Sequence, residues 1–456
     1  MNYEEAMAFL EDTKKYGSQL GLESIRNLMH ELGDVQEQVP AVHIGGTNGK
    51  GSVGAMLSAV LSEAGYRVGR FATPDVFAYE EEFLMNGKPV TKERLAQLFT
   101  DVSEACQKLT AKGLPHPTRF EVETAAAFLW FFEEDCDLAL VEVGMGGATD
   151  ATNLITRPLV SLLTSVSMDH MQFLGNTLRE IAQVKAGIIK KGCPVVTVAQ
   201  KPEVMEVIRQ TAGEKQARLI VAEFSQAEDV VYTPAGSSFS VRGDGAGSSL
   251  PVELGIPGSW QVENALCALK TLEILVGKYP KITRGTVQAG LKEARWPGRL
   301  EQISSDPVFF LDGAHNEDAV RKLRFSFDAI FPERTVVYIM GVLADKDYSG
   351  MIRQMFRSGD RVFTVTPPNP RGLPAEALAA ALQNCGVSAV PCESSAEAVR
   401  HAVAEAGRED VILAFGSLSY LKGIREQFSL TRSFQREGAA AGVRKYGADL
   451  RGEKTV

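Results

Sequence analysis

A glycine-rich segment, Gly45 to Ser52 (GGTNGKGS), contains the residue types that bind phosphate. It follows an apolar run at 41–44 and precedes apolar residues at helical spacing over 53–64. In a strand–loop–helix unit, glycines let backbone N–H groups converge on phosphate oxygens, and the helix N-terminus adds its dipole. Lys50 would add a positive charge, and Ser52 would contact a phosphate or a magnesium-bound water. The alternative interpretation is a glycine turn with a surface lysine.

Three further side chains have the chemistry of an active site. Glu142 ends the apolar strand expected over 138–143, and the carboxyl ends of parallel strands are where open α/β sheets bind ligands. It is either a salt-bridged strand end or a magnesium ligand. His170 follows another expected strand and is either structural or a metal ligand. Lys185 lies in an apolar helix, where it must find a partner, change chemically, or extend to the surface.

The elements around these residues predict an α/β fold with two domains. Strands alternate with helices, which is typical of a mostly parallel sheet covered on both faces. We expect a P-loop NTPase-like, doubly wound domain over 1–296, with short antiparallel strands inserted at about 218–258. Pro297 and Gly298 interrupt the helical pattern, and strand–helix alternation restarts as a smaller Rossmann-like domain over 297–430. The charged tail, 431–456, is expected to be loosely ordered.

The composition of the 456 residues is that of a globular protein, with 45% hydrophobic and 23% charged residues. A net charge of −9 argues against a nucleic-acid or anionic-membrane partner. The longest apolar run is the eight residues 125–132, well short of the roughly 18 to 20 that span a bilayer. The N-terminus is acidic and does not resemble a signal peptide. The six cysteines are dispersed without a C-x-x-C pair, which indicates reduced thiols and no zinc site. A cytoplasmic monomer is therefore expected.

The phosphate loop departs from the general G-x-x-x-x-G-K-[ST] pattern, because its first glycine is one residue too close and Gly51 separates the lysine from the serine. This form resembles the loop of the Mur ligase superfamily and, within it, the folylpolyglutamate and dihydrofolate synthase family. The resemblance runs from about residue 5 to about residue 425. Eight motifs carry it in order: GTNGKGS, TRFEVETAAAF, VEVGMGGATDATN, SMDHMQFLGNT, IAQVKAGIIK, WPGRLE, LDGAHN and MGVLADKD.

The resemblance implies an ATP-dependent ligase that uses two magnesium ions. By their matches to family motifs, Thr73, Glu142 and His170 would bind metal, and Lys185 would be carbamylated. The catalytic residues would be Lys50, Lys185, Asp312 and His315. Because Asp312 and His315 lie beyond the junction from Lys50, we expect closure of a cleft between domains to assemble the site. The residues matching nucleotide contacts are Gly46, Thr47, Asn48, Gly49, Lys50, Gly51, Ser52, Asn264, Arg299 and Asp312.

Three segments match those that line the pterin pocket of relatives, and Phe120 offers a ring that would either stack on the pterin or pack in the core. Two departures concern this side of the site. Asp75 replaces a histidine common in relatives, and the acidic YEEE that follows is unusual. Trp260 also stands where relatives often have a histidine near the base pocket. The matching residues are Gln19, Leu20, Gly21, Leu22, Thr118, Arg119, Phe120, Glu121, Thr149, Asp150 and Ala151.

The activity implied is ATP-dependent ligation of L-glutamate to a folate carboxylate, and also to dihydropteroate, through an acyl phosphate. Which of these substrates is accepted stays open. Two alternatives are another Mur-type ligase acting on a cell-wall nucleotide and a P-loop nucleotide switch without ligation. The TRFE and DATN segments favour the folate ligase over the cell-wall ligase.

Overall fold

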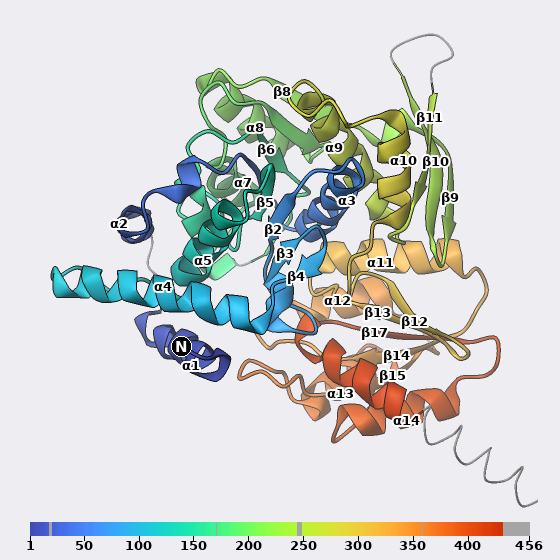
Figure 1. Ribbon diagram of the computed structural model, residues 1–456. Coiled ribbons are helices and arrows are strands. Elements are labelled where there is room, and N and C mark those ends of the chain that lie inside the picture. Colours follow the sequence, from blue (N-terminus) through green and yellow to red (C-terminus); the bar gives the residue numbers. More distant parts are fainter. Residues whose placement is uncertain (18–20, 170, 244–248, 358, 432–456) are drawn as a thin grey trace, which may run out of the picture. The chain divides into compact units, whose positions relative to one another are not determined.

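The computed structural model describes residues 1–17, 21–169, 171–243, 249–357 and 359–431. Two compact units form the chain, of which one is Met1–Pro297 and the second begins at Gly298. Figure 1 shows the helices and strands of the two units. The charged tail predicted after residue 431 lies outside the described residues.

The first unit is built on an eight-stranded sheet in which six neighbouring strands run parallel. This confirms the predicted mostly parallel sheet. Two strands at one edge are antiparallel and were not anticipated from the sequence. The strands in spatial order are β4 (Lys88–Pro89), β3 (Phe83–Met85), β2 (Val68–Phe71), β5 (Leu138–Glu142), β1 (Ala41–Gly45), β6 (Val160–Leu163), β7 (Val195–Val198) and β8 (Leu219–Ala222).

Helices cover both faces of this sheet, as the alternating pattern predicts (Figure 1). Val42 and Ile44 of β1 pack into a core with α3, α9 and α10, whereas Ala41 faces the opposite core with α1, α2, α4 and α5. A third core lies between the sheet and the helices α7 and α8. The bounds are α1 (Tyr3–Asp12), α2 (Glu23–Glu31), α3 (Lys50–Glu63), α4 (Lys92–Ala111), α5 (Arg119–Glu133), α6 (Met171–Leu174), α7 (Leu178–Ala186), α8 (Pro202–Glu214), α9 (Trp260–Leu275) and α10 (Arg284–Glu293).

A separate three-stranded antiparallel sheet occupies most of the region predicted to hold short antiparallel strands. It consists of β9 (Ala227–Thr233), β10 (Gly236–Arg242) and β11 (Ser249–Leu254). The prediction was wrong at its start, because β8 pairs parallel with β7 in the main sheet. Its four residues, LIVA, form a short apolar run. Such a run does not show whether the strand belongs to the edge of the main parallel sheet or to the antiparallel sheet.

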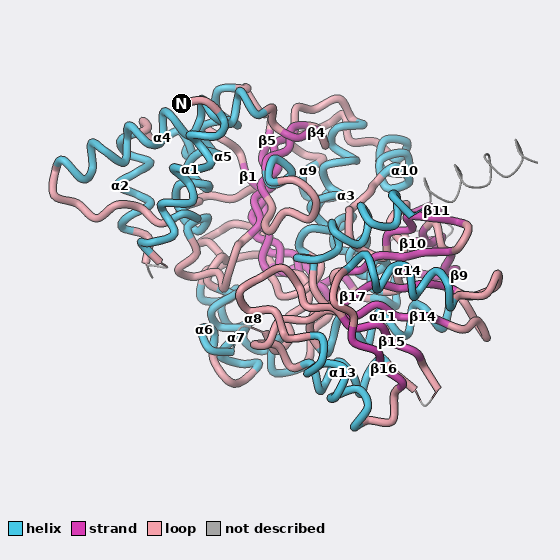
Figure 2. The backbone as a smooth tube through the Cα atoms, turned by 90° about the horizontal axis from the view of Figure 1, so that it is seen from below, coloured by secondary structure: helices cyan, strands magenta, loops and turns pink. Residues whose placement is uncertain are grey.

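The second unit is a six-stranded sheet, and its strands β13, β17, β14, β15 and β16 are parallel. The antiparallel edge strand β12, paired with β13, is an addition to the prediction. Figure 2 shows the strands β14, β15 and β16 side by side. The bounds are β12 (Glu301–Ser305), β13 (Val308–Asp312), α11 (Glu317–Ile330), β14 (Val336–Met340), α12 (Tyr348–Met355), β15 (Arg361–Thr364), α13 (Ala375–Asn384), β16 (Ser388–Pro391), α14 (Ser395–Glu405) and β17 (Val411–Phe415).

The structure bears on two predicted properties of the chain, its reduced cysteines and its lack of a membrane-spanning segment. All six cysteines are free thiols, and burial raises the pKa of Cys106 to about 12, so that thiol is not a nucleophile at neutral pH. In the described part of the chain, no helix has the length and apolar character needed to cross a bilayer.

Candidate active site

The segment 45–52 joins β1 to α3, which confirms the predicted strand–loop–helix unit. Gly46 and Gly49 have φ values of 133° and 93°, a region that side chains disfavour. A Cβ at Gly46 would also lie 2.0 Å from Thr164 Oγ1. The Thr47 backbone N–H donates to the Ser165 carbonyl at 2.7 Å, which ties the loop to the segment after β6. The loop that leads into α3 therefore has a backbone conformation that requires glycine at positions 46 and 49.

Lys50, the first residue of α3, folds back over this loop. Its Nζ donates to the carbonyl oxygens of Gly46 and Thr47, both at 3.3 Å. The same Nζ lies 3.6 Å from Glu142 Oε1, and both side chains are largely buried. The two residues predicted from separate motifs are thus neighbours. Glu142 ends β5 as an ion-paired carboxylate, which was one of its two interpretations.

Lys185 lies in α7 with its amine directed to the phosphate loop. Its Nζ donates to the Gly46 carbonyl at 2.9 Å, and the residue is only 5% exposed. The side chain therefore does not extend to the surface. Burial and, to a smaller extent, the nearby charge of Lys50 lower the pKa of Lys185 to about 7, although Asp169 and Asp150 act in the opposite direction. A lysine with this pKa has a substantial neutral fraction at neutral pH.

Arg70 is a neighbour of the loop that was not predicted from the sequence. It lies on β2, is 4% exposed, and donates from Nη2 to the Gly51 carbonyl at 2.8 Å. Its guanidinium stacks on Trp296 at 3.9 Å from the ring centroid. Burial lowers the pKa of Arg70 to about 10, against the attraction of Glu142. An arginine inside the short apolar strand VGRF was the available signal, since a buried charge needs partners.

The nucleotide residues predicted in α3 and α9 are also connected. Gln261 Nε2 donates to Ser52 Oγ at 3.1 Å, and Asn264 Nδ2 donates to Gln261 Oε1 at 2.9 Å. A Cβ at Gly49 would lie 2.5 Å from Asn264 Oδ1. Asn264, 215 positions away along the sequence, is therefore packed against the phosphate loop.

The TRFE segment forms the start of α5. Thr118 is the N-cap, and it and Glu121 cap each other's backbone N–H groups in a capping box. Glu121 also accepts a hydrogen bond from Ser24 Oγ at 3.1 Å. The Phe120 ring stacks near Phe71, with 5.9 Å between ring centroids. Thr118 and Glu121 thus hold the helix start in place, and Phe120 has the core contact that its alternative interpretation describes.

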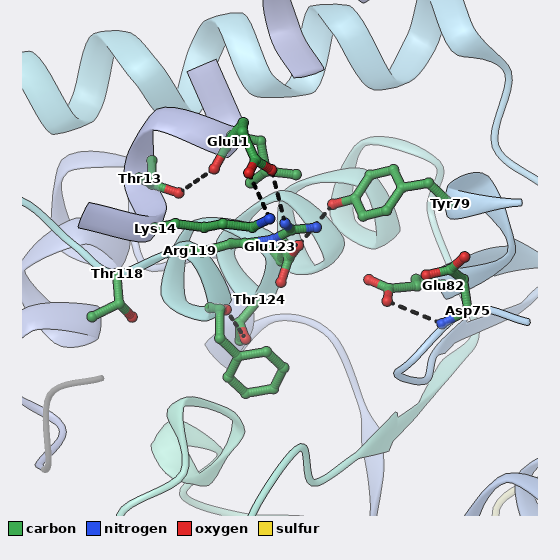
Figure 3. A network of polar contacts seen from close by, with 12 residues as sticks. Glu11, Thr13, Lys14, Asp75, Tyr79, Glu82, Thr118, Arg119, Glu123 and Thr124 are labelled. Carbon is green, nitrogen blue, oxygen red and sulfur yellow. Dashed lines mark hydrogen bonds and ion pairs between the residues drawn. The ribbon is translucent and has the colours of Figure 1, made fainter. Parts of the chain in front are cut away.

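Arg119 belongs to a network of charged side chains that spans α5 and the segment after β2 (Figure 3). Its Nε donates to Glu123 Oε1 at 2.8 Å, and the Tyr79 hydroxyl donates to the same oxygen at 3.0 Å. Glu82 accepts from the Asp75 backbone N–H at 3.2 Å, while its Oε2 is buried without a partner among the described residues. Burial and the charges of Glu123 and Asp75 hold the pKa of Glu82 well above its usual value.

The DATN segment places a second buried carboxylate. Asp150 caps the 3₁₀ turn Ala151–Leu154 and accepts hydrogen bonds from the Met145 and Thr152 backbones and from the Thr152 hydroxyl. Burial raises the pKa of Asp150, although those donors and Lys50 oppose the rise. Ala151 is buried and Thr149 is exposed. Of the remaining predicted residues of this unit, Gly21 is exposed and Leu22 and Thr73 are half-buried, while Gln19, Leu20 and His170 lie outside the described residues.

In the second unit, Asp312, Arg299 and His315 come together at the end of β13. Asp312 accepts from the backbone N–H groups of Leu300 and Ala314, both at 2.7 Å. Burial raises its pKa, and Arg299 opposes the rise. His315 Nδ1 lies 2.9 Å from the Gly313 carbonyl, so Nδ1 carries the proton and Nε2 is the basic nitrogen of the neutral ring. Both Asp312 oxygens therefore accept backbone hydrogen bonds, and the half-buried His315 ring is oriented by its Nδ1 contact.

No group of three or more His, Cys, Asp or Glu side chains in the described ranges forms a metal-binding cluster. Magnesium does not require one, because it binds through one or two carboxylates and keeps several waters. Near the loop, the carboxylate of Glu142 and the hydroxyl of Ser52 are oxygen donors with the chemistry that suits this ion.

Comparison with known families agrees with this fold. The Mur ligase middle domain matches residues 85–272, and the Mur ligase glutamate ligase domain matches residues 298–418. The Bacillus subtilis dihydrofolate synthase/folylpolyglutamate synthase is 33% identical over 435 residues, which cover 93% of this chain and 99% of that protein. The chain belongs to the folylpolyglutamate and dihydrofolate synthase family of Mur ligases.

Solved structures give the same result. Mycobacterium tuberculosis folylpolyglutamate synthase complexed with ADP and AMPPCP superposes with a TM-score of 0.84 at 30% identity, covering 94% of this chain and 99% of that one. Escherichia coli FolC in complex with DHPP and ADP has a TM-score of 0.80 at 28% identity, covering 94% and 98%. The chain is thus an ATP-dependent ligase by family, with the two α/β units that this family has.

Proposed function

We propose that the protein joins L-glutamate to the carboxylate of a folate and to that of dihydropteroate, at the expense of ATP. The observation that carries the proposal is the convergence of Lys50, Glu142 and Lys185 on one glycine-rich loop, in a chain of this family. Relatives named for one or for both activities support the two substrates.

The reaction begins with attack of the substrate carboxylate on the γ-phosphate of ATP. The backbone N–H groups of the loop and the Lys50 ammonium stabilise the charge that spreads over the transferring phosphoryl group. ADP leaves, and the acyl phosphate remains. The amine of L-glutamate then attacks the acyl carbon, and phosphate departs as the amide bond forms. Asn264 and Arg299 are proposed nucleotide contacts.

Thr73, Glu142 and His170 are the proposed magnesium ligands. Bound magnesium would neutralise phosphate charge as the phosphoryl group transfers. Lys185 is proposed to be carbamylated, because a buried amine with a lowered pKa supplies the neutral form that combines with carbon dioxide. The neutral amine and carbon dioxide give a carbamate anion and release one proton, so a neutral side chain becomes an anion beside the loop.

His315 is the proposed base that takes the proton from the glutamate amine. Its Nδ1 contact leaves Nε2 as the basic nitrogen, whereas both Asp312 oxygens accept backbone hydrogen bonds. Asp312 then serves to hold the segments that carry Arg299 and His315. A His315→Ala variant should lose turnover but keep ATP binding. An unchanged rate would reject this role.

The pterin end of the substrate is proposed to bind near Phe120 and Asp150, together with Gly21 and Leu22, which directly precede α2. A panel of dihydropteroate, tetrahydrofolate and a Mur-type cell-wall nucleotide, read by mass spectrometry, tests the substrate class directly. Glutamyl products from the first two and none from the nucleotide are expected. ADP release must depend on both glutamate and the pterin substrate; release without them would indicate a nucleotide switch.

The protein is further proposed to act as a cytoplasmic monomer. Size-exclusion chromatography with light scattering should give a mass close to that of one 456-residue chain. A stable dimer at micromolar concentration would reject the monomer.

A further inference from the structure

His43 is a fully buried polar residue in the central strand of the first unit. It lies on β1, two residues before the phosphate loop, and its exposed fraction is 0%. Burial lowers the pKa of His43 to about 3, with a smaller contribution from Lys190, so the imidazole is neutral. None of the mechanism described above uses this residue.

The ring is the end of a chain of hydrogen bonds that leads to Asp150. His43 Nε2 lies 2.8 Å from Thr152 Oγ1, and Thr152 Oγ1 donates to Asp150 Oδ1 at 2.5 Å. The Thr152 backbone N–H donates to the same carboxylate oxygen at 3.0 Å, and the Met145 N–H donates to Asp150 Oδ2 at 2.8 Å. His43 lies 109 positions from Thr152 in the sequence, and the fold brings β1 against the DATN turn.

The direction of each hydrogen bond follows from the atoms. A hydroxyl has one proton, and the Thr152 proton points to the carboxylate, so its oxygen must accept from His43. Nε2 of His43 therefore carries the proton of the neutral ring. His43 Nδ1 is then an acceptor, and it is buried with no hydrogen-bond partner in the described part of the chain. An aliphatic side chain in β1 would avoid that unsatisfied acceptor, so the histidine is not the best residue for packing alone.

We propose that His43 and Thr152 are positioning residues of the substrate subsite, which orient the carboxylate of Asp150 toward the N–H donors of the pteridine ring. The inference rests on the proposed function, which places Asp150 at the pterin end of the substrate. His43 fixes the Thr152 hydroxyl, and this hydroxyl fixes one oxygen of Asp150. Asp150 is also close enough to Lys185 for its charge to favour the protonated amine, so the chain of contacts ends near the phosphate loop.

Two matched pairs of variants separate positioning from packing. Thr152→Val removes the hydroxyl at nearly constant volume, whereas Thr152→Ser keeps it. His43→Gln places an amide N–H where Nε2 lies, whereas His43→Asn places its amide nearer the position of Nδ1 and loses the contact. We expect Thr152→Val and His43→Asn to raise the KM for dihydropteroate about tenfold, with the KM for ATP within about twofold. Thr152→Ser and His43→Gln should keep the KM for dihydropteroate close to that of the wild type.

The control is Thr271→Val, which makes the same change at a buried threonine of α9 whose hydroxyl donates to the Cys267 carbonyl at 2.9 Å. It should change the melting temperature alone. The double variant of Thr152→Val and His43→Asn should be no worse than the single ones, because both break one chain. A raised KM for Thr152→Ser equal to that for Thr152→Val, or an unchanged KM in folded Thr152→Val, would overturn the proposal. Should His43→Asn fail to fold, the threonine pair decides.

Asp150→Asn distinguishes this inference from the function on which it rests. If Asp150→Asn raises the KM for dihydropteroate but Thr152→Val does not, the positioning role fails and the subsite stands. If Asp150→Asn leaves that KM unchanged, Asp150 is no substrate contact, and both the subsite and the positioning role are rejected. Glutamate ligation itself would still be tested by the substrate panel.

Discussion

Two groups of buried charges in the first unit differ in how their charges are balanced. Around the phosphate loop, the cations Lys50, Lys185 and Arg70 alternate with the carboxylates of Glu142 and Asp150. The acidic network, which we define as Asp75, Tyr79, Glu82, Arg119 and Glu123, has three carboxylates and one guanidinium (Figure 3).

The two groups shift pKa values in opposite directions. At the loop, burial and a neighbouring lysine lower the pKa of Lys185 to about 7, so a cation tends toward its neutral form. In the acidic network, burial and like charges raise the pKa values of Glu82 and Glu123, so these carboxylates tend toward their neutral, protonated form. The loop group is also bound to backbone carbonyls, whereas the acidic network is held mainly by side chains. We therefore expect the first to govern catalysis and the second to govern stability.

Removing the Lys50 charge should have the largest effect. Lys50→Ala keeps the glycines of the loop but loses the ammonium proposed to face the γ-phosphate. Turnover should fall by about 10³-fold or more, while the melting temperature stays close to that of the wild type. Amide formation at a near-normal rate in a folded Lys50→Ala protein would contradict the role of the loop.

Lys185→Ala should be nearly inactive for a different reason, because it removes a proposed carbamate and not a cation. Small carboxylates such as acetate should partly restore its rate by occupying the space. The matched control is Lys190→Ala, since Lys190 also donates to a backbone carbonyl, that of Asn153 at 3.1 Å, and burial lowers its pKa to about 8. That variant should remain active.

The pH dependence of the modification follows from the same pKa. The carbamate needs the neutral amine, so wild-type activity that depends on carbon dioxide should fall as pH drops below about 7. Incubation with ¹³C-labelled bicarbonate and NMR would detect the label at one site. A full rate in carbon dioxide-free buffer at pH 6, together with an active Lys185→Ala enzyme, would remove the carbamate from the mechanism and leave the ligase assignment intact.

Glu142→Gln keeps the shape of the side chain but removes the charge proposed to bind magnesium. The magnesium concentration for half-maximal rate should rise by more than about tenfold, with a smaller loss of rate at saturating magnesium. Titration of the rate with magnesium at fixed ATP measures both. An unchanged titration would mean that Glu142 serves Lys50 and Arg70 only, as an ion-pair partner.

The loop group could be predicted from the sequence because each of its main residues lies in a short contiguous motif or ends an apolar strand. Lys50 and Glu142 were predicted separately, and the parallel order of β1 and β5 brings them within 3.6 Å. Arg70 could not be assigned a role, because its partners Gly51 and Trp296 depend on how α3 and the end of the unit pack.

The acidic network gave a weaker signal. The unusual residue Asp75 and the acidic run after it were visible, but their partner Glu123 lies one helical turn beyond Arg119 in a segment that otherwise indicates an apolar helix. The same limit applies to strands. β3 and β4 pair by main-chain contacts at an edge, with too few residues to show a period of two.

The smallest effect we expect is on stability, and it distinguishes the acidic network most directly from the loop. A carboxyl group whose pKa is higher in the folded than in the unfolded protein stabilises the fold at low pH, and loses that contribution as pH rises through its folded pKa. Glu82 is such a group: Asp75 and Glu123 repel its charge, and Arg119 only partly compensates.

Glu82→Gln replaces this carboxyl with a neutral side chain that does not titrate. At about pH 4 the variant and the wild type should therefore have similar melting temperatures. At pH 8 the variant should melt on the order of 2–4 °C higher, because it no longer has a carboxyl group whose ionised form is disfavoured by burial and by the charges of Glu123 and Asp75. Glu63→Gln is the control, since Glu63 is exposed at the last residue of α3 and should show no such trend. A melting difference for Glu82→Gln that does not grow with pH would mean that the network balances its charges as well as the loop does.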